Sequence, residues 1–182
     1  VQVSYLGYPG TIGADHIHYL IADPTLIPNN KQHYYTEKIV YMPNSYQVNV
    51  SKRNISKAPL SRDNFGLPNN GFIFCCFNNT YKITPPTFSL WMNILKEVDE
   101  SVLWLFESNN NSVINLKKEA IKYGINEKRM VFASHMPVED HLNRLQLADL
   151  FIDTLPYNAH TTSSDALRMG LPVLTCLGES FA

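Results

Sequence analysis

The sequence has 182 residues, of which 45% are hydrophobic, and carries a formal net charge of -1 at pH 7. Nine Phe and ten Tyr supply enough apolar surface for a packed core, which argues against a disordered tail. The chain has neither a Lys/Arg run nor a basic half, which argues against a general binder of nucleic acids or membrane surfaces. A negatively charged ligand therefore has to be held locally by a few groups.

The cysteines favour a reducing compartment. Cys75, Cys76 and Cys176 each lie in an apolar run, as small buried side chains do, and an odd count does not suit a disulfide framework. No apolar stretch reaches the ~18 to 20 residues that a membrane span needs. The N-terminus has no signal-peptide pattern and no Met, so we expect a cytoplasmic protein whose sequence here is cut from a longer chain.

The first part of the chain predicts short strands and turns. In chain order we expect a strand at 1–6, a glycine-punctuated turn at 7–13, a short helix running into a strand at 17–23, and an apolar run at 39–42. Residues 44–70 are polar and rich in Asn, Ser, Lys and Pro, a composition typical of a linker. We therefore expect two domains, residues 1–66 and 67–182.

The second part alternates regularly between strands and helices. The expected strands are 72–77, 102–106, 130–133, 150–152 and 172–176, and the expected helices are 85–95, 113–123, 138–148 and 163–169. Thr84 is a good N-cap with Pro85 at the first helical position, whereas Asn109 to Asn111 are expected in a loop. Continuous apolar strands alternating with helices predict a doubly wound α/β domain with a parallel sheet.

Ligands of such sheets bind beyond the carboxyl ends of the strands. The polar segments at these ends are 78–82, 107–108, 134–136, 153–154 and 177–179. The strongest candidate follows the fourth strand, where a helix begins within His160 to Ser164. A helix start favours a phosphate, and Thr161 and Thr162 add hydroxyl donors. The alternative is an ordinary N-cap box with Asp165 near the first turn.

Three further segments are candidates. Lys82 follows the first strand and either neutralises a phosphate or is a solvated surface lysine. His141 and Arg144 share a helix face and either stack on and bond to a base, or belong to a surface helix on which Glu139, Asp140 and Arg144 form weak ion pairs. The turn 7–13 either lets the backbone approach a ligand or is only a tight structural turn. We expect no metal, because the histidines lack a third ligand at a recognisable spacing.

Five segments together resemble the catalytic region of the protein O-linked N-acetylglucosaminyltransferase family. They are LGYPGTIGA (6–14), YTEKIVYMP (35–43), CFNNTYKITP (76–85), LADLFIDTLPYNAHTTSSDAL (147–167) and GLPVLTCLGESFA (170–182). Bacterial-like members and the related plant protein O-fucosyltransferases share the pattern. The resemblance implies a two-lobed GT-B architecture of Rossmann-like lobes. Residues 1–66 would end the N-terminal lobe and 67–182 would form most of the donor lobe, with tetratricopeptide repeats upstream.

The resemblance also implies roles for particular residues. Lys82, His160, Thr161 and Thr162 would hold the diphosphate, and Asp165 would accept from a ribose hydroxyl. The remaining implied contacts are His141 packing on uracil, Arg144 beside it, main chain at Met136 and Pro137 on the base edge, Asn79 near the diphosphate, and Leu6, Gly7 and Pro9 beside the sugar. Asn79 replaces the Gln usual in animal members, and Val138 replaces a Lys that contacts the nucleotide.

The implied activity is inverting, metal-independent transfer of N-acetylglucosamine from UDP-GlcNAc to Ser or Thr hydroxyls of proteins. No cofactor is implied, and Lys82 would stabilise the leaving diphosphate. The general base would lie upstream of Val1, so we expect this chain alone to be inactive. Two alternatives remain open: a GDP-fucose donor, as in the plant relatives, and a non-catalytic nucleotide-binding or scaffold module.

Overall fold

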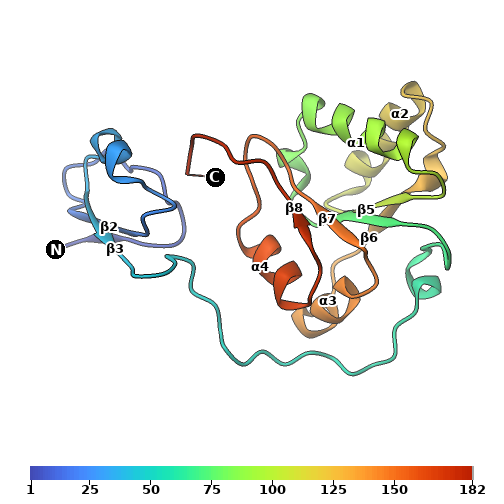
Figure 1. Ribbon diagram of the computed structural model, residues 1–182, viewed down its shortest axis with the longest axis horizontal. Helices are drawn as coiled ribbons and strands as arrows, with labels where there is room; N and C mark the ends of the chain where they lie inside the picture. Colours follow the sequence, from blue (N-terminus) through green and yellow to red (C-terminus); the bar gives the residue numbers. More distant parts are fainter. Residues whose placement is uncertain (182) are drawn as a thin grey trace. The chain divides into compact units, whose positions relative to one another are not determined.

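The computed structural model describes residues 1–181, and the chain forms two compact units. The first unit comprises Val1–Lys52 and residues 178–181, and the second comprises Arg53–Leu177. Each unit contains its own parallel sheet (Figure 1).

The first unit contains a three-stranded parallel sheet in the order β1-β2-β3. The strands are β1 (Val3–Ser4), β2 (Tyr19–Ala22) and β3 (Lys38–Tyr41), and the 3-10 helix η1 (Asn29–Tyr34) precedes β3. Leu20, Ala22 and Ile27 form its small buried core. The helix expected at the start of 17–23 is therefore absent there: this segment enters β2, which is hydrogen-bonded to strands on both sides.

The second unit begins earlier than the boundary expected near residue 67. Residues 53–66 group with it because they are hydrogen-bonded to its helices and sheet. Asn143 Nδ2 donates to the Ala58 carbonyl oxygen at 2.9 Å, and the Ser56 amide donates to the Glu139 carbonyl oxygen at 3.2 Å. The polar composition of this segment indicates exposure, but it does not reveal such long-range bonds.

The sheet of the second unit has five parallel strands in the order β6-β5-β4-β7-β8. Their bounds are β4 (Ile73–Cys76), β5 (Val102–Phe106), β6 (Met130–Ala133), β7 (Leu150–Ile152) and β8 (Val173–Leu174). β4 is buried at every position, as a central strand covered on both faces must be. The expected doubly wound α/β fold is thereby confirmed, although β8 is shorter than the predicted strand.

Helices cover both faces of this sheet. The helices α1 (Pro85–Glu97) and α2 (Asn110–Lys122) lie on one side, and α3 (Val138–Leu145) and α4 (Thr161–Arg168) lie on the other (Figure 1). Short 3-10 turns lie at Arg62–Phe65, Thr80–Lys82 and Glu127–Arg129. The core between the layers contains the fully buried side chains of Trp104, Phe151 and Met92.

The helix starts follow local capping chemistry. The Thr84 side chain accepts from the Thr87 amide and Pro85 opens α1, as predicted. The expected loop at Asn109 to Asn111 is wrong, because Asn109 caps α2 by accepting from the Ser112 amide and the next two residues are already helical. α4 likewise begins at Thr161, two residues before the predicted start.

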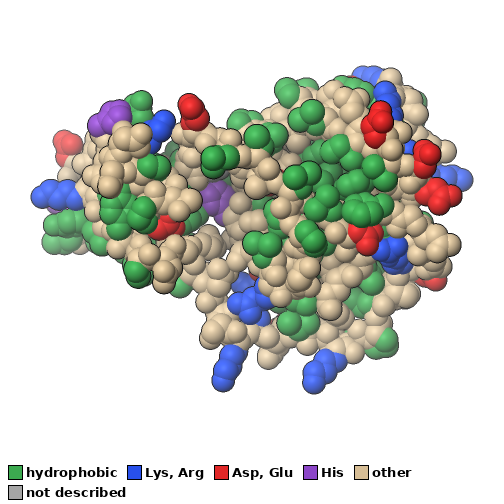
Figure 2. Space-filling view, viewed as in Figure 1, with side chains coloured by type: hydrophobic (Ala, Val, Ile, Leu, Met, Phe, Trp, Pro, Cys, Tyr) green, Lys and Arg blue, Asp and Glu red, His purple; other side chains and the backbone are tan. Residues whose placement is uncertain are grey.

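The surface of the second unit carries apolar side chains that gather on the face seen in Figure 2. Leu90 of α1 and Leu174 of β8 are both exposed and line a hollow of about 180 Å³ together with Leu155. Within residues 1–181, no helix is long and apolar enough to cross a membrane.

Candidate functional site

The sheet order of the second unit creates a topological switch point between β4 and β7. The chain leaves β4 toward β5 on one side, whereas β7 and β8 lie on the other side. In doubly wound sheets, loops that leave the carboxyl ends of two such strands diverge, and ligands bind in the crevice between them. The segments at this crevice are residues 77–84 after β4 and residues 153–160 after β7.

Asp153 anchors the loop that follows β7. Its side chain is buried, and Oδ1 accepts from the backbone amides of Thr154 and Ala159, both at 2.8 Å. Its Oδ2 accepts from the Thr175 hydroxyl at 2.7 Å. Because the amides of Thr154 and Ala159 converge on one carboxylate, the intervening loop is folded back over the end of the sheet. The carboxylate thus sets where α4 begins.

Asn78 connects the two sides of the switch point. Its Nδ2 donates to Asp153 Oδ1 at 3.1 Å and to Thr154 Oγ1 at 2.8 Å. Its Oδ1 accepts the hydroxyl proton of Thr162 in the first turn of α4. The Thr162 hydroxyl was expected to donate to a phosphate, but its proton is already bound by Asn78. Backbone amides of the first helical turn and the Thr161 hydroxyl are then the donors available from this run.

Lys82 reaches from the β4 side toward the loop of β7. Its Nζ donates to the Asn158 carbonyl oxygen at 3.0 Å and lies 4.2 Å from the centroid of the Tyr157 ring. Partial burial lowers the pKa of Lys82, while Asp153 and Cys76 act in the opposite direction. The side chain is therefore directed across the crevice and is not a fully solvated surface lysine.

His160 occupies the N-cap position of α4. Its backbone carbonyl accepts from the Ser164 amide at 3.1 Å and from the Ser163 hydroxyl at 2.8 Å. Burial and the nearby Lys82 lower the pKa of the imidazole, and Asp153 opposes this shift. An N-cap box formed by Thr or Ser at the cap position is not what the structure shows, because the hydroxyl residues lie inside the helix.

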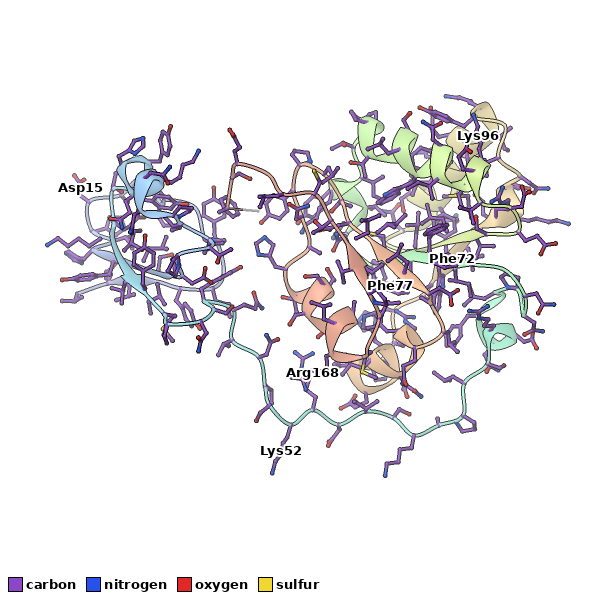
Figure 3. The ribbon with its side chains drawn as sticks, in the orientation of Figure 1. Asp15, Lys52, Phe72, Phe77, Lys96 and Arg168 are labelled. Carbon is purple, nitrogen blue, oxygen red and sulfur yellow. The ribbon has the colours of Figure 1, made fainter. Side chains whose placement is uncertain are left out.

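His141 and Arg144 form a second group on α3. Arg144 is 2% exposed, and its Nε donates to Nδ1 of His141 at 3.0 Å. The Phe77 ring, which follows β4 and lies inside the second unit (Figure 3), packs edge-on against the imidazole with centroids 5.2 Å apart. The structure thus links α3 to the end of β4, but it buries the guanidinium that was expected beside a base.

The other expected positions of the second unit lie around these groups. Pro137 is the N-cap of α3 and is exposed, next to the half-buried Met136. Asn79 is exposed and accepts from the Tyr81 amide at 3.4 Å, which starts the turn that carries Lys82. Asp165 is 9% exposed, and its Oδ1 already accepts from Arg53 Nη1 at 2.6 Å. A ribose hydroxyl would therefore share this carboxylate with Arg53.

Leu6, Gly7 and Pro9 belong to the first unit. Leu6 adopts a φ of 66°, and the Gly7 amide closes a tight turn by donating to the Tyr5 carbonyl oxygen at 2.8 Å. Further along the same loop, the Ile12 amide and the Thr11 hydroxyl donate to the buried Glu37, which directly precedes β3, at 2.6 Å and 2.7 Å. Burial opposes ionisation of Glu37, but these hydrogen bonds outweigh it and lower its pKa.

Sequence reasoning included Asn78 and Asp153 only as members of the polar segments 78–82 and 153–154, and it assigned no role to Asn158 or Glu37. The first two follow predicted strands directly, and that position was the available signal. Glu37 lies 25 residues from the amide that it binds, so no local pattern reveals it. Among residues 1–181, no group of three or more His, Cys, Asp or Glu side chains is placed to hold a metal ion.

Comparison with known proteins places this chain in a family. The family model of glycosyl transferase family 41 matches residues 1–58 and 49–182. A probable UDP-N-acetylglucosamine–peptide N-acetylglucosaminyltransferase, SEC, of Arabidopsis thaliana is 37% identical over 100% of this chain and 19% of its own length. The UDP-N-acetylglucosamine–peptide N-acetylglucosaminyltransferase of Caenorhabditis elegans is 38% identical over 67% of this chain and 11% of its own length.

A solved structure agrees with these sequence matches. An O-GlcNAc transferase of Thermobaculum terrenum, in a mutant form, matches 100% of this chain and 34% of its own chain, with a TM-score of 0.83 and 30% identity. The expected resemblance and the GT-B fold class are thereby confirmed. The chain spans about a fifth or less of the length of the curated relatives named above. This chain belongs to glycosyl transferase family 41.

Proposed function

We propose that the second unit binds the nucleotide diphosphate of UDP-GlcNAc at the switch point between β4 and β7. In the protein that contains it, this unit would serve inverting, metal-independent transfer of N-acetylglucosamine to Ser or Thr hydroxyls of acceptor proteins. Family membership supports this activity, and the relatives' names give the donor and the peptide acceptor. The exposed Cys176 and the buried Cys75 and Cys76, all reduced, suit a cytoplasmic location.

The observation that carries the proposal is the direction of Lys82. Its ammonium group lies across the crevice, bonded to the Asn158 carbonyl oxygen, on the same edge as the start of α4. A cation and the backbone donors of a helix start together form a site for a diphosphate. When a sugar leaves a diphosphate, negative charge grows on the leaving oxygen, and donors already in place stabilise it without a metal.

Each of the neighbouring groups would contact a different part of the nucleotide. Asn79 would lie near the diphosphate, main chain at Met136 and Pro137 would meet the base edge, and Asp165 would bind the ribose. Leu6, Gly7 and Pro9 of the first unit would adjoin the sugar. These assignments follow the family resemblance. Arg144 is buried, which favours a role in holding His141 over direct contact with uracil.

Nucleotide selectivity tests the proposal. We expect UDP to raise the melting temperature of the 182-residue chain, because a ligand that binds only the folded state stabilises it by about 2.7 kcal/mol at 100 times its Kd. GDP at the same concentration should have little effect. A shift with GDP alone would support the fucosyl donor instead, and no shift with either nucleotide would leave the scaffold alternative. A transfer assay with the full-length protein, UDP-GlcNAc and a Ser/Thr peptide then tests the activity itself.

A further inference from the structure

Two uncharged groups hold the ammonium group of Lys82. Its Nζ donates to the Asn158 carbonyl oxygen at 3.0 Å and lies 4.2 Å from the centroid of the Tyr157 ring. A cation is attracted to the face of an aromatic ring when it lies within about 6 Å of the centroid. Two other lysines, Lys31 and Lys96, lie 5.9 Å from the centroids of tyrosine rings, so the contact of Lys82 is much closer. The Tyr157 ring is therefore a strong partner of this cation.

Hydrogen bonds hold the loop that carries Tyr157. The Thr154 hydroxyl donates to the Tyr157 carbonyl oxygen at 2.8 Å. The Asn158 side chain donates to the Thr154 carbonyl oxygen at 3.0 Å and to the Thr175 hydroxyl at 3.1 Å. Because these bonds fix the backbone at Tyr157 and Asn158, both partners of the ammonium group are in place before a ligand arrives.

The partners of Lys82 leave its positive charge available. A carboxylate in contact with the ammonium group would offset the charge that an anion needs, whereas a ring and a carbonyl oxygen stabilise the cation without a net charge of their own. Burial lowers the pKa of Lys82 and the Asp153 carboxylate opposes this shift, but the Asp153 oxygens already accept from two amides, a hydroxyl and the Asn78 side chain. An ammonium group has more than one N–H donor, and Asn158 accepts from one of them, so donors remain for a ligand.

The same ring contacts the start of α4. Its centroid lies 5.8 Å from that of the His160 imidazole, at an interplanar angle of 47°. Burial and the charge of Lys82 lower the pKa of His160 although Asp153 opposes this shift, so the imidazole is neutral at pH 7 and does not meet the ring as a cation. Tyr157 therefore connects the ammonium group of Lys82 to the N-cap residue of α4.

We propose that Tyr157 is a positioning residue for Lys82: the face of its ring holds the ammonium group beside the start of α4 and leaves the positive charge available to the diphosphate. The inference rests on the proposed function, since it takes Lys82 as the cation that meets the diphosphate. Tyr157 acts through Lys82 and does not contact the ligand in this role. It raises the fraction of molecules in which the cation is already in place, and the apparent affinity rises with that fraction.

The first test needs no ligand. In the 182-residue chain with 13C-labelled lysine, the carbon bonded to Nζ reports the protonation of Lys82 during a pH titration, and the spectrum of Lys82→Met identifies its signal. Tyr157→Phe keeps the ring and should retain the wild-type pKa of Lys82. Phenylalanine analogues with increasing ring fluorination at position 157 keep nearly the same shape but attract a cation less, so this pKa should fall stepwise. An unchanged pKa across the series means that the ring only fills space, and it overturns the proposal.

The second test measures UDP affinity over the same series by titration calorimetry. A cation–π contact of this kind changes an equilibrium constant by about two- to fivefold, and we expect the affinity to fall by that factor between Tyr157→Phe and the most fluorinated ring. An affinity that rises with fluorination means that the ring withholds Lys82 from the ligand. Either that rise or an unchanged affinity overturns the proposal.

A double-mutant cycle separates positioning from contact. In the Lys82→Met background, fluorination should have little further effect on UDP affinity, since the effect passes through the ammonium group. A loss of the same size in that background means that the ring meets the nucleotide itself, which also overturns the proposal. Tyr34→Leu is the control, because it removes an exposed ring near Lys31 in the first unit. It should alter neither the pKa of Lys82 nor UDP affinity.

Failure of this inference and failure of the proposed function have different signatures. If the pKa of Lys82 follows fluorination but the wild-type chain binds no UDP, the proposed function fails while the hold of Tyr157 on Lys82 stands. If UDP binds but fluorination changes neither the pKa nor the affinity, the proposed function stands and positioning by Tyr157 fails.

Discussion

The two units of the chain hold their loops at the ends of parallel strands with buried carboxylates, but to different extents. In the first unit, Glu37 accepts from the Ile12 amide and the Thr11 hydroxyl and so holds the loop of residues 7–13. In the second unit, Asp153 accepts from two amides, the Thr175 hydroxyl and the Asn78 amide group. The second loop is thus tied both to the next strand, β8, and to the segment after β4.

This difference has a physical consequence for ligand binding. Glu37, which directly precedes β3, accepts from the loop of residues 7–13 and fixes the shape of that loop. Asp153 and Asn78 instead connect the segments after β4 and β7, so they also fix the distance between Lys82 and the start of α4. Both loops are built around a carboxylate, but the second unit also carries the ammonium group of Lys82 beside its loop. This ammonium group supports the proposal that the second unit binds a diphosphate.

The largest expected effect is on the anchor of the second unit. Asp153→Ala leaves the amides of Thr154 and Ala159 and the partners on Asn78 and Thr175 unsatisfied, each at a cost of about 1–3 kcal/mol if it stays buried. We expect the free energy of unfolding of this unit to fall by about 3 kcal/mol or more. Both tryptophans, Trp91 and Trp104, lie in this unit, so their fluorescence during urea unfolding reports it.

The matched control for the anchor is Asp99→Ala, at an exposed carboxylate of the same unit. It should change the free energy of unfolding by no more than about 0.5 kcal/mol. Equal losses from Asp153→Ala and Asp99→Ala would contradict the view that Asp153 anchors the loop of the second unit.

The next effect concerns the cation of the second unit. Lys82→Met in the full-length protein should lower kcat by about 10²- to 10³-fold, with a smaller change in KM, if the charge on the diphosphate grows in the transition state. Steady-state kinetics with UDP-GlcNAc measures both constants. Lys118→Met, at an exposed lysine on α2, is the control and should leave both unchanged. Unchanged turnover in Lys82→Met would mean that the cation of the second unit does not stabilise the diphosphate.

A smaller effect is expected at the anchor of the first unit. Glu37→Gln keeps one acceptor oxygen but loses the charge, so we expect the loop to lose about 1–2 kcal/mol of protection. Hydrogen exchange of the Ile12 amide measures this loss locally. Second-unit tryptophan fluorescence should not change, and a parallel loss there would show that the two loops are not held independently.

The Glu37 effect should depend on pH. Because the pKa of Glu37 is lowered in the folded chain, its contribution is fully present above the unfolded pKa near 4.5 and is lost as pH falls through the folded value. The difference between wild type and Glu37→Gln should therefore shrink on acidification and not on alkalinisation. A difference that persists at the lowest pH would mean that the charge of Glu37 is not what holds Ile12.

The smallest effect is expected at Arg53. Arg53→Ala removes a partly exposed ion pair with Asp165 and should lower the stability of the second unit by under about 1 kcal/mol. It also releases the carboxylate proposed to bind the ribose, so UDP affinity should stay the same or rise. Titration calorimetry measures the affinity, with the exposed Lys52→Ala as control. Markedly weaker UDP binding would assign Arg53 to the site itself.

The sequence by itself determined the layout of the second unit. Continuous apolar strands, the Thr84–Pro85 helix start and polar residues after each strand are local signals, so β5, β6 and β7 have their predicted bounds. The same signals indicated the ends of β4 and β7 as the place of the site. Capping by Asn109 was missed because an Asn run is typical of loops, and the short helix expected at 17–23 was wrong because pairing on both sides favours a strand.

The tertiary structure alone decided which polar side chains are available. By residue type, Arg144 and Thr162 are good hydrogen-bond donors. In the structure, however, Arg144 donates to His141 and Ser134, and Thr162 donates to Asn78. Asp165 likewise meets Arg53, 112 residues away in sequence. Such partners come from distant segments, and a buried polar group takes whichever partner the packing brings near. Residue type and spacing therefore predict where a site lies, but packing decides which atoms face the ligand.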